Sequence, residues 1–267
     1  MDTFANYILG EKNLVSKIEI AYYLSKKEKI FFDKSVIFKT ELARLFLKYN
    51  KLELDENLIL TACLLCNCKK VHNSRNEEDI KAYAKNGAEY LKTLGFDKRF
   101  CKICEEVNRY SGSNPREKES DVIELVDHFG AMLLDRPERI GFKPDEALVL
   151  LKHRNLKGEY NRYLESFEQF INLLQNISMK DTVEIKPLKK LKKMCNESED
   201  VKTFMQKVIN EYEIEVDLLI DKEYEKIKDQ MFQCNLKNRA MFTEETTQRI
   251  IGNLEKKNIN LNKVEEV

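Results

Sequence analysis

The sequence predicts an all-α protein, and three features carry that prediction. Glycine and proline, the residues that most often end helices, number only 8 and 4 among 267 residues. Lysine, glutamate and leucine, which are good helix formers, are abundant, and 34% of residues are charged. Apolar residues recur at the spacing of amphipathic helices along most of the chain. We therefore expect a bundle in which one face of each helix is buried.

Three helices are expected in the N-terminal part of the chain. The first covers about 12–27 and the second about 35–49, each with apolar residues on one face. The third differs, because the run from Leu58 to Cys66 is apolar nearly all the way round a helix. Such a helix is usually enclosed by others. Asp55 is placed to cap its first turn.

The middle of the chain continues with helices that have recognisable ends. One begins near Asp79 and is stopped by Gly95, since glycine is favoured just after a helix C-terminus. Asp97 caps the next helix. A loop with turn-forming residues at 110–120 separates this helix from another that begins at Asp121. Two further helices are expected at 144–151 and 160–177.

The composition changes after Ser178, and we place a soft boundary near residue 179. The basic stretch Lys186–Lys193 is short, lacks interleaved aromatic residues and is followed at once by acidic ones. We interpret it as a solvated linker rather than as a surface for nucleic acid or acidic membranes. A long helix is expected at about 199–233 and a last one near 244–257. The predicted organisation is an N-terminal helical segment (1–34), a central domain (35–178) and a C-terminal helical extension (179–267).

Charge and hydropathy exclude several classes of protein. Lys and Arg total 46, as do Asp and Glu, so the whole molecule is not steered toward polyanions. No apolar segment reaches the roughly 18–20 residues of a membrane span, and the N-terminus lacks the basic region of a signal peptide. The seven cysteines are then expected to be reduced thiols in the cytoplasm.

Five of the cysteines form two clusters, C-x-x-C-x-C at 63–68 and C-x-x-C at 101–104. The spacing is that of a zinc or iron–sulfur framework, but zinc ligands usually lie on turns, whereas both clusters lie inside apolar helical runs. Cysteine is also one of the most frequently buried residues. We therefore favour packing in the core over metal binding.

Four segments together carry a resemblance to a known family: LTACLLCNCKK, NGAEYLKTLGF, RYSGSNP and VDHFGAMLLDRPERIGFKPDEALVLL. They resemble the HD superfamily of metal-dependent phosphohydrolases, most closely its HD-GYP branch of cyclic di-GMP phosphodiesterase-like domains in bacterial signalling. The similarity covers about 35–177. It implies an all-α bundle in which bound metals would activate a water for phosphodiester hydrolysis.

Carried over residue by residue, the resemblance leaves almost no metal ligands. The vestigial site positions are Phe38, Cys66, Asn67, Tyr83, Glu106, Val107 and Asp127. Only Asp127 matches a ligand of the family. Phe38 and Val107 have no lone pair to offer, and one carboxylate cannot hold a centre of two metals. We therefore expect a catalytically degenerate domain without a cofactor.

Three basic residues match basic positions of the family motifs, namely Lys70, Arg136 and Arg139. They could hold a phosphate group without hydrolysing it. The interpretation that we prefer is structural, because surface ion pairs are common. In that interpretation Arg136 and Arg139 fix their turn by pairing with Asp135, Glu138 or other carboxylates.

The leading hypothesis is a pseudoenzyme that acts as a regulatory, ligand-sensing or protein-interaction module. Its expected partners are a protein or a second copy, bound through the C-terminal helices, and a nucleotide is a candidate ligand. The alternative is a divergent phosphohydrolase whose divalent metal is held by Cys66, Cys68, Asp127 and His72. A third, less favoured class binds nucleic acid or a membrane surface through Lys186–Lys193.

Overall fold

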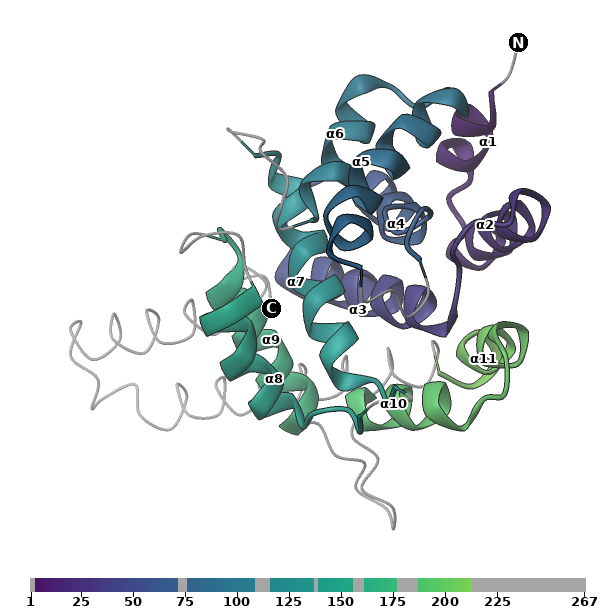
Figure 1. Ribbon diagram of the computed structural model, residues 1–267. Coiled ribbons are helices and arrows are strands. Elements are labelled where there is room, and N and C mark those ends of the chain that lie inside the picture. Colours follow the sequence, from purple (N-terminus) through teal and green to yellow (C-terminus); the bar gives the residue numbers. More distant parts are fainter. Residues whose placement is uncertain are drawn as a thin grey trace, which may run out of the picture.

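The fold is all-α, which confirms the predicted fold class (Figure 1). A computed structural model describes residues 3–71, 76–108, 116–136, 139–155, 161–176 and 187–212. These ranges contain eleven α-helices and two π-helical turns, and no β-strand. The α-helices are α1 (Phe4–Gly10), α2 (Leu14–Glu28), α3 (Lys34–Asn50), α4 (Glu56–Leu65), α5 (Glu77–Thr93), α6 (Lys98–Glu106), α7 (Lys118–Leu133), α8 (Pro144–Leu150), α9 (Leu164–Asn176), α10 (Pro187–Glu197) and α11 (Val201–Lys207).

Helix α4 is enclosed by its neighbours, as the sequence predicts. It contacts α1, α2, α3, α6 and α7, and Figure 1 shows it in the middle of these elements. Seven consecutive residues, Ile59–Leu65, are buried. The side chain of Asp55 accepts a hydrogen bond from the backbone N–H of Leu58 at 3.0 Å, so the predicted N-cap is present.

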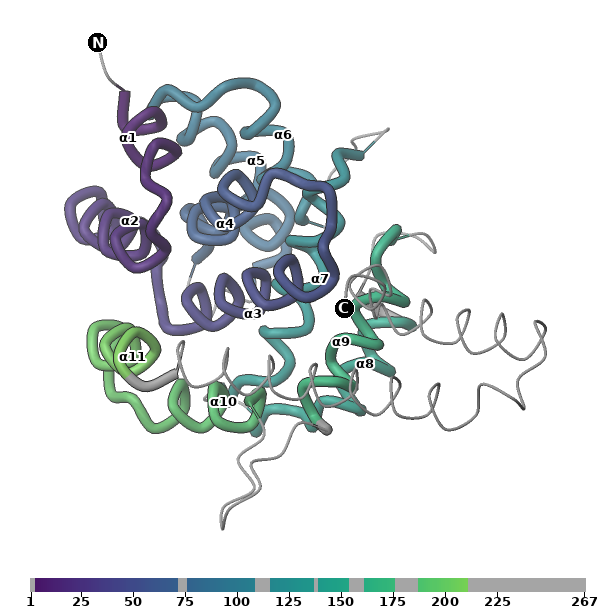
Figure 2. The backbone as a smooth tube through the Cα atoms, turned by 180° about the vertical axis from the view of Figure 1, so that it is seen from behind, coloured from purple at the N-terminus to yellow at the C-terminus, as the bar shows by residue number. Residues whose placement is uncertain are grey.

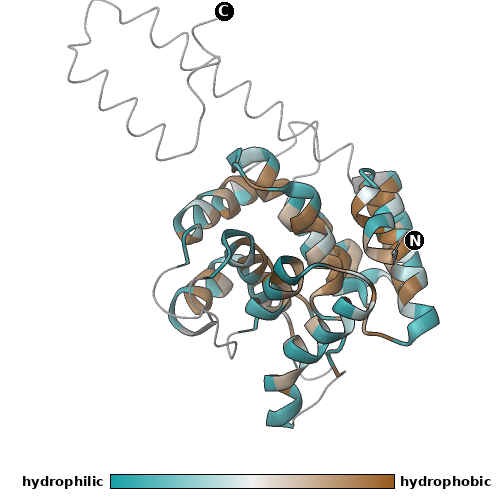
Figure 3. Ribbon diagram, turned by 90° about the horizontal axis from the view of Figure 1, so that it is seen from above, coloured by the Kyte–Doolittle hydropathy of each residue, from teal (hydrophilic) through white to brown (hydrophobic). Residues whose placement is uncertain are grey.

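Helices α3 and α7 form the rest of the centre and pack directly against each other (Figure 2). Twelve consecutive residues of α3, Val36–Leu47, are buried. Phe46 of α3 and Phe129 of α7 both meet Phe167 of α9 edge to face, with ring centroids 5.2 Å and 5.3 Å apart. Figure 3 shows hydrophobic and hydrophilic residues alternating along the helices, as expected for helices buried on one side.

Two of the predicted helix ends have a clear physical cause. Gly95 has φ +92°, and a Cβ atom there would lie 2.5 Å from Cβ of Thr3, so both conformation and space require glycine. The side chain of Asp97 accepts a hydrogen bond from the N–H of Phe100 at 2.7 Å. Helix α1, by contrast, was not predicted, because seven residues with only Ala5 and Ile8 buried are too short for a periodic signal.

The interpretation of the basic stretch as a solvated linker is wrong for residues 187–193. These residues belong to helix α10, whose apolar side contacts α3 and α9. The sequence signal is the helical spacing of apolar residues between the lysines. The buried residues on that side are Leu188, Leu191, Met194 and Cys195.

Helix α10 is also attached to the start of α3 by a partly buried polar contact. The ammonium group of Lys34 donates to the carbonyls of Cys195 at 2.7 Å and Ser198 at 2.5 Å, at the C-terminal end of α10. Helix α11 contacts α3 as well, and a π-helical turn, Val208–Tyr212, follows it. This is where the long helix at 199–233 was expected; its remaining residues, and the helix at 244–257, lie outside the described residues. Among the described helices, none is long and apolar enough to span a membrane.

Candidate functional site

Three buried polar side chains meet at the centre of the bundle and form the Lys39–Asp127–Asn67 cluster. The ammonium nitrogen of Lys39, on α3, lies 2.7 Å from Oδ1 of Asp127, on α7. The side-chain amide of Asn67, in the turn that ends α4, donates to the same oxygen at 2.8 Å. The exposed fractions are 3% for Lys39, 6% for Asp127 and 2% for Asn67. One carboxylate oxygen therefore accepts hydrogen bonds from both a buried ammonium group and a buried amide.

Local packing explains how Lys39 reaches this position. Gly130 lies on α7, one turn after Asp127, and a Cβ atom there would approach Cγ of Lys39 to 2.8 Å. The glycine thus leaves room for the aliphatic part of the lysine. The same Cβ would meet the ring of Phe38 at 3.4 Å, so Phe38 fills the space beside the lysine. Asn67 is held by its backbone, since its carbonyl accepts from the N–H of Lys70 at 2.8 Å.

The electrostatics of the cluster favour a charged pair. Burial opposes both charges, but the Lys39 charge, with smaller effects of Lys70 and His128, holds the pKa of Asp127 well below its ordinary value. Burial likewise opposes the charge of Lys39, and the charge and hydrogen bond of Asp127 outweigh it, so the pKa of Lys39 is raised. The carboxylate and the ammonium group are therefore both ionised at neutral pH.

Lys70 lies at the edge of the cluster and is half-buried. Its ammonium group is 5.6 Å from the centroid of the Phe31 ring. Burial lowers the pKa of Lys70, and the nearby charge of Lys39 lowers it further. Arg136 and Asp33 also influence this pKa, which places their charges in the same region.

Arg139 helps to fix the turn after α7 through backbone carbonyls. The expected pairing with Glu138 concerns a residue outside the described ranges. The guanidinium group of Arg139 donates to the carbonyls of Ala131 at 2.8 Å and Met132 at 3.0 Å, at the C-terminus of α7. A cation at that end is favoured by the helix dipole. The backbones of Arg136 and Arg139 exchange two hydrogen bonds, of 2.9 Å and 3.1 Å. Arg139 therefore has a structural role, while Arg136 is exposed.

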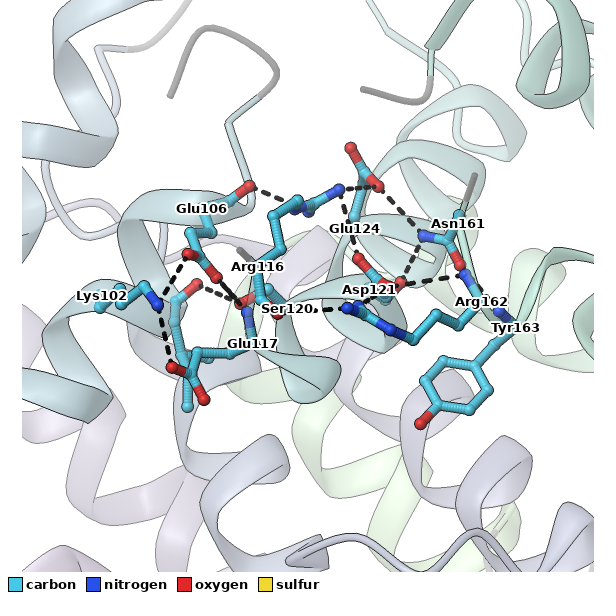
Figure 4. A network of polar contacts seen from close by, with 11 residues as sticks. Lys102, Glu106, Arg116, Glu117, Ser120, Asp121, Glu124, Asn161, Arg162 and Tyr163 are labelled. Carbon is cyan, nitrogen blue, oxygen red and sulfur yellow. Dashed lines mark hydrogen bonds and ion pairs between the residues drawn. The ribbon is translucent and has the colours of Figure 1, made fainter. Parts of the chain in front are cut away.

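A second polar assembly, the Glu106–Arg116 network, lies apart from the cluster and joins α6, α7 and the residues before α9 (Figure 4). Glu106 is fully buried. Its Oε2 accepts from the hydroxyl of Ser120 at 2.7 Å and the N–H of Glu117 at 2.8 Å. Lys102 lies 3.6 Å from its Oε1. The structure therefore places Glu106, one of the vestigial positions, in this network rather than beside Asp127.

Arg116 is the hub of the other half of the network. Its guanidinium group contacts Oε2 of Glu124 at 2.9 Å and Oδ1 of Asp121 at 3.3 Å. Arg162 pairs with Oδ2 of Asp121 at 2.5 Å, and Asn161 donates to Oε2 of Glu124 at 3.0 Å. Each of these buried carboxylates thus has a cationic partner. The arrangement connects chain segments and has the character of a structural clamp.

The remaining vestigial positions differ in burial and in chemistry. Phe38 and Val107 are buried apolar residues, and Tyr83 is half-buried on α5. Cys66 ends α4, and its sulfur lies 3.6 Å from the amide nitrogen of Asn67. Of the predicted set, the structure therefore brings together Cys66, Asn67 and Asp127.

The cysteines of α4 and α6 are buried free thiols. Burial raises the pKa of Cys66 well above its ordinary value, and the Asp127 charge adds to this; burial also raises the pKa of Cys68, to about 12. The sulfurs of Cys66 and Cys68 approach the carbonyls of Cys63 and Gly87, each at 3.9 Å. These thiols are packed as small apolar groups, not presented as thiolates.

The residues present do not fit the metal centre that the resemblance implies. Within the described ranges, no three residues among His, Cys, Asp and Glu are grouped so that they could hold a metal ion. His72, proposed as a ligand in the alternative hypothesis, lies outside the described residues. The carboxylate of Asp127 already holds the Lys39 ammonium. In the part of the chain that the structure describes, Asp127 thus takes part in an internal ion pair rather than in a chelating donor set.

Lys39 is the site residue that sequence reasoning missed, although a signal was present. It precedes Leu42, Phe46 and Tyr49 at intervals of helical spacing, so it shares the face that was predicted to be buried. A lysine is rarely fully buried unless it is paired. A lysine on a core face therefore indicates a buried acidic partner. Asp127, already a candidate site residue, is that partner.

Comparison with known proteins identifies no relative of this chain. No family model, curated protein or solved structure matches the chain. Chemically, the carboxylate of Asp127 is already bonded to an ammonium and an amide, so it is a poor base and a poor metal ligand. The ammonium groups of Lys39 and Lys70 can instead attract an anion.

Proposed function

We propose that this chain is a catalytically degenerate HD-GYP-like domain that acts as a regulatory module, sensing a ligand or binding a protein partner. The observation that carries the proposal is the 2.7 Å contact between Lys39 and Asp127. Asp127 is the one position at which the resemblance retains a metal ligand. Its charge is neutralised from within the chain, so the domain does not depend on a metal at this point.

Energetics favour the internal pair over a metal. A metal ion at Oδ1 of Asp127 would have to displace the ammonium group of Lys39, whose side chain is only 3% exposed. Leaving one partner of a buried ion pair without its counter-charge costs about 3–5 kcal/mol. Several additional ligands would be needed to offset that cost, and Phe38 and Val107 supply none.

The balance of charge near the cluster supports a ligand-sensing role. Lys39, Lys70 and Arg136 act on the same region as the carboxylates of Asp127 and Asp33. Two ammonium groups, of Lys39 and Lys70, thus act on each other in this region. A phosphorylated or nucleotide ligand would be attracted to such a site, and Asp127, which already accepts from Lys39 and Asn67, is a poor base for its hydrolysis.

A metal analysis combined with a hydrolysis assay tests the proposal. We expect protein purified without oxygen to contain less than one transition metal per chain. We also expect no hydrolysis of cyclic dinucleotides above the blank with added Mn²⁺, Mg²⁺ or Fe²⁺. A thermal shift with cyclic dinucleotides or nucleotides would support the sensing role, and no shift with any of them would leave a protein partner as the remaining form of the proposal.

Two variants make the assay specific. Stoichiometric metal with hydrolysis that is lost in Asp127→Asn would favour the divergent phosphohydrolase instead. Asp121→Asn is the matched control, since Asp121 is also a buried carboxylate of α7 but belongs to the Glu106–Arg116 network. Activity that survives in the control and disappears in Asp127→Asn would assign the reaction to this cluster.

A further inference from the structure

The Lys39–Asp127–Asn67 cluster has hydrogen-bonding capacity that its own residues do not use. An ammonium group has three N–H donors. In the described part of the chain the Lys39 ammonium donates to Oδ1 of Asp127 alone, although its side chain is 3% exposed. Oδ1 of Asn67 is buried as well, and no described residue donates to it. Buried polar groups normally have partners, so these atoms point to a bound molecule.

The orientation of the Asn67 amide is fixed by its neighbour. Its nitrogen must face Oδ1 of Asp127, because turning the amide would place two acceptor oxygens against each other. The amide oxygen of Asn67 can therefore accept a hydrogen bond only from a donor outside the cluster. The ammonium of Lys39 and the amide of Asn67 both contact one oxygen, so their unused donors and acceptor lie close together.

The surroundings favour a small anion that can also donate a proton. The ammonium groups of Lys39 and Lys70 act on the same region, since the charge of Lys39 lowers the pKa of Lys70. Oxygen atoms of an anion would accept from the ammonium groups, but an anion without a proton would be repelled by Oδ1 of Asn67. The cluster is not completely sealed from solvent, because 9% of the Asp127 side chain is exposed and Lys70 is half-buried.

We propose that the Lys39–Asp127–Asn67 cluster binds a small oxyanion that carries a hydroxyl group. This inference rests on the proposed ligand-sensing function and names its ligand chemistry. The oxyanion oxygens accept hydrogen bonds from Lys39 and from Lys70 at the rim. The hydroxyl group donates to Oδ1 of Asn67, and Oδ2 of Asp127, which neither internal bond uses, is a second acceptor for it.

Inorganic phosphate and sulfate provide a matched pair of probes for the full-length chain. At pH 7 phosphate retains at least one hydroxyl group, whereas sulfate of similar size has none. With sulfate bound, Oδ1 of Asn67 would stay buried without a donor, and this free-energy cost would weaken sulfate binding by about tenfold or more. We expect titration calorimetry at constant ionic strength to show phosphate binding with at least about tenfold higher affinity than sulfate.

Three variants locate the binding. Lys39→Met should abolish the phosphate signal, and Asn67→Leu should reduce the preference for phosphate over sulfate. Lys17→Met is the matched control, because Lys17 is an equally buried lysine that donates to the carbonyl of Ile8 and the hydroxyl of Thr61 instead. This control should leave phosphate binding unchanged.

Equal binding of phosphate and sulfate would mean an adventitious ion only and would overturn the inference, as would the absence of phosphate binding to the unmodified chain. Neither outcome depends on a variant that folds. Either result would leave the proposed function to be decided by its own metal and hydrolysis measurements, so the two can fail separately.

Discussion

The ammonium of Lys39 and the carboxylate of Asp127 form a buried ion pair of 2.7 Å that joins α3 to α7. Removing either partner leaves the other charge buried and unpaired. We expect Lys39→Met and Asp127→Asn each to lower the free energy of unfolding by about 3–5 kcal/mol. The double variant should lose less than the sum of the single losses, which chemical denaturation of the four proteins measures. Additive losses would show that the pair is not coupled.

The same pair predicts a dependence of stability on acid pH. The Lys39 charge keeps the pKa of Asp127 below its ordinary value of 3.8, in spite of burial. The unfolded chain therefore takes up this proton first as the pH falls, and the stabilisation is present above pH 3.8 and lost below it. Chemical denaturation of the unmodified chain and of Asp127→Asn between pH 6 and pH 3 measures the free energy of unfolding of each protein. The difference between the two free energies should become smaller below about pH 4. A constant difference would contradict the assignment.

Gly130 and Gly87 form a matched test of how tightly the cluster is packed. A Cβ atom on Gly130 would lie 2.8 Å from Cγ of Lys39, whereas one on Gly87 would meet the sulfur of Cys68 at an ordinary 3.4 Å. We expect Gly130→Ala to destabilise the protein by about 1–3 kcal/mol, because the stem of a buried lysine must move. Gly87→Ala should be neutral or stabilising by up to about 1 kcal/mol, since alanine favours a helix. Thermal denaturation of both variants compares them directly, and equal effects would refute the close contact.

The fold class and the enclosed helix α4 could be predicted from sequence, because both depend on local patterns. Apolar residues on every side of Leu58–Cys66 require neighbours all round, whatever those neighbours are. The caps at Asp55 and Asp97 follow from side chains that bond within one turn. Short helices such as α1 escape this reasoning, since seven residues give too few repeats of the pattern.

The candidate site could be predicted only in part, because its central contact joins residues far apart in the chain. Asn67 and Asp127 were singled out through the resemblance to family motifs, but Lys39 lies 88 residues from Asp127 and has no motif of its own. Glu106 was expected near Asp127 and instead pairs with Ser120 and Lys102. A motif gives the position of a residue on its helix, whereas its partner depends on which helices pack together.

Arg116 and Arg99 offer a comparison between a buried and an exposed cation in the same region. The side chain of Arg116 is 13% exposed and pairs with Glu124, which is fully buried. Arg99 is 48% exposed and pairs with Glu117 and Glu119. We expect Arg116→Met to cost about 3–5 kcal/mol of stability, and Arg99→Met about 1 kcal/mol or less. Similar losses, measured by urea denaturation, would show that the Glu106–Arg116 network does not act as a clamp.

Lys17 gives a prediction of the opposite sign at alkaline pH. It is 1% exposed, and its ammonium donates to the carbonyl of Ile8 at 2.7 Å and the hydroxyl of Thr61 at 2.8 Å. Burial, with the charge of Lys12, lowers its pKa from 10.5 to about 8, although Glu11 and Asp55 act in the other direction. The folded chain therefore releases this proton before the unfolded chain does, and the protein gains stability as the pH rises from 8 to 10.5.

Lys17→Met isolates this effect from other groups that titrate in the same range. The stability of the unmodified chain relative to Lys17→Met should be constant below about pH 7 and should increase by up to about 3 kcal/mol by pH 10.5. Denaturation of both proteins between pH 6 and pH 10.5 gives this difference, because shared changes, such as ionisation of the buried thiols on unfolding, cancel. A difference that falls with pH would show that the ammonium of Lys17 is stabilised, not penalised, by its contacts with α1 and α4.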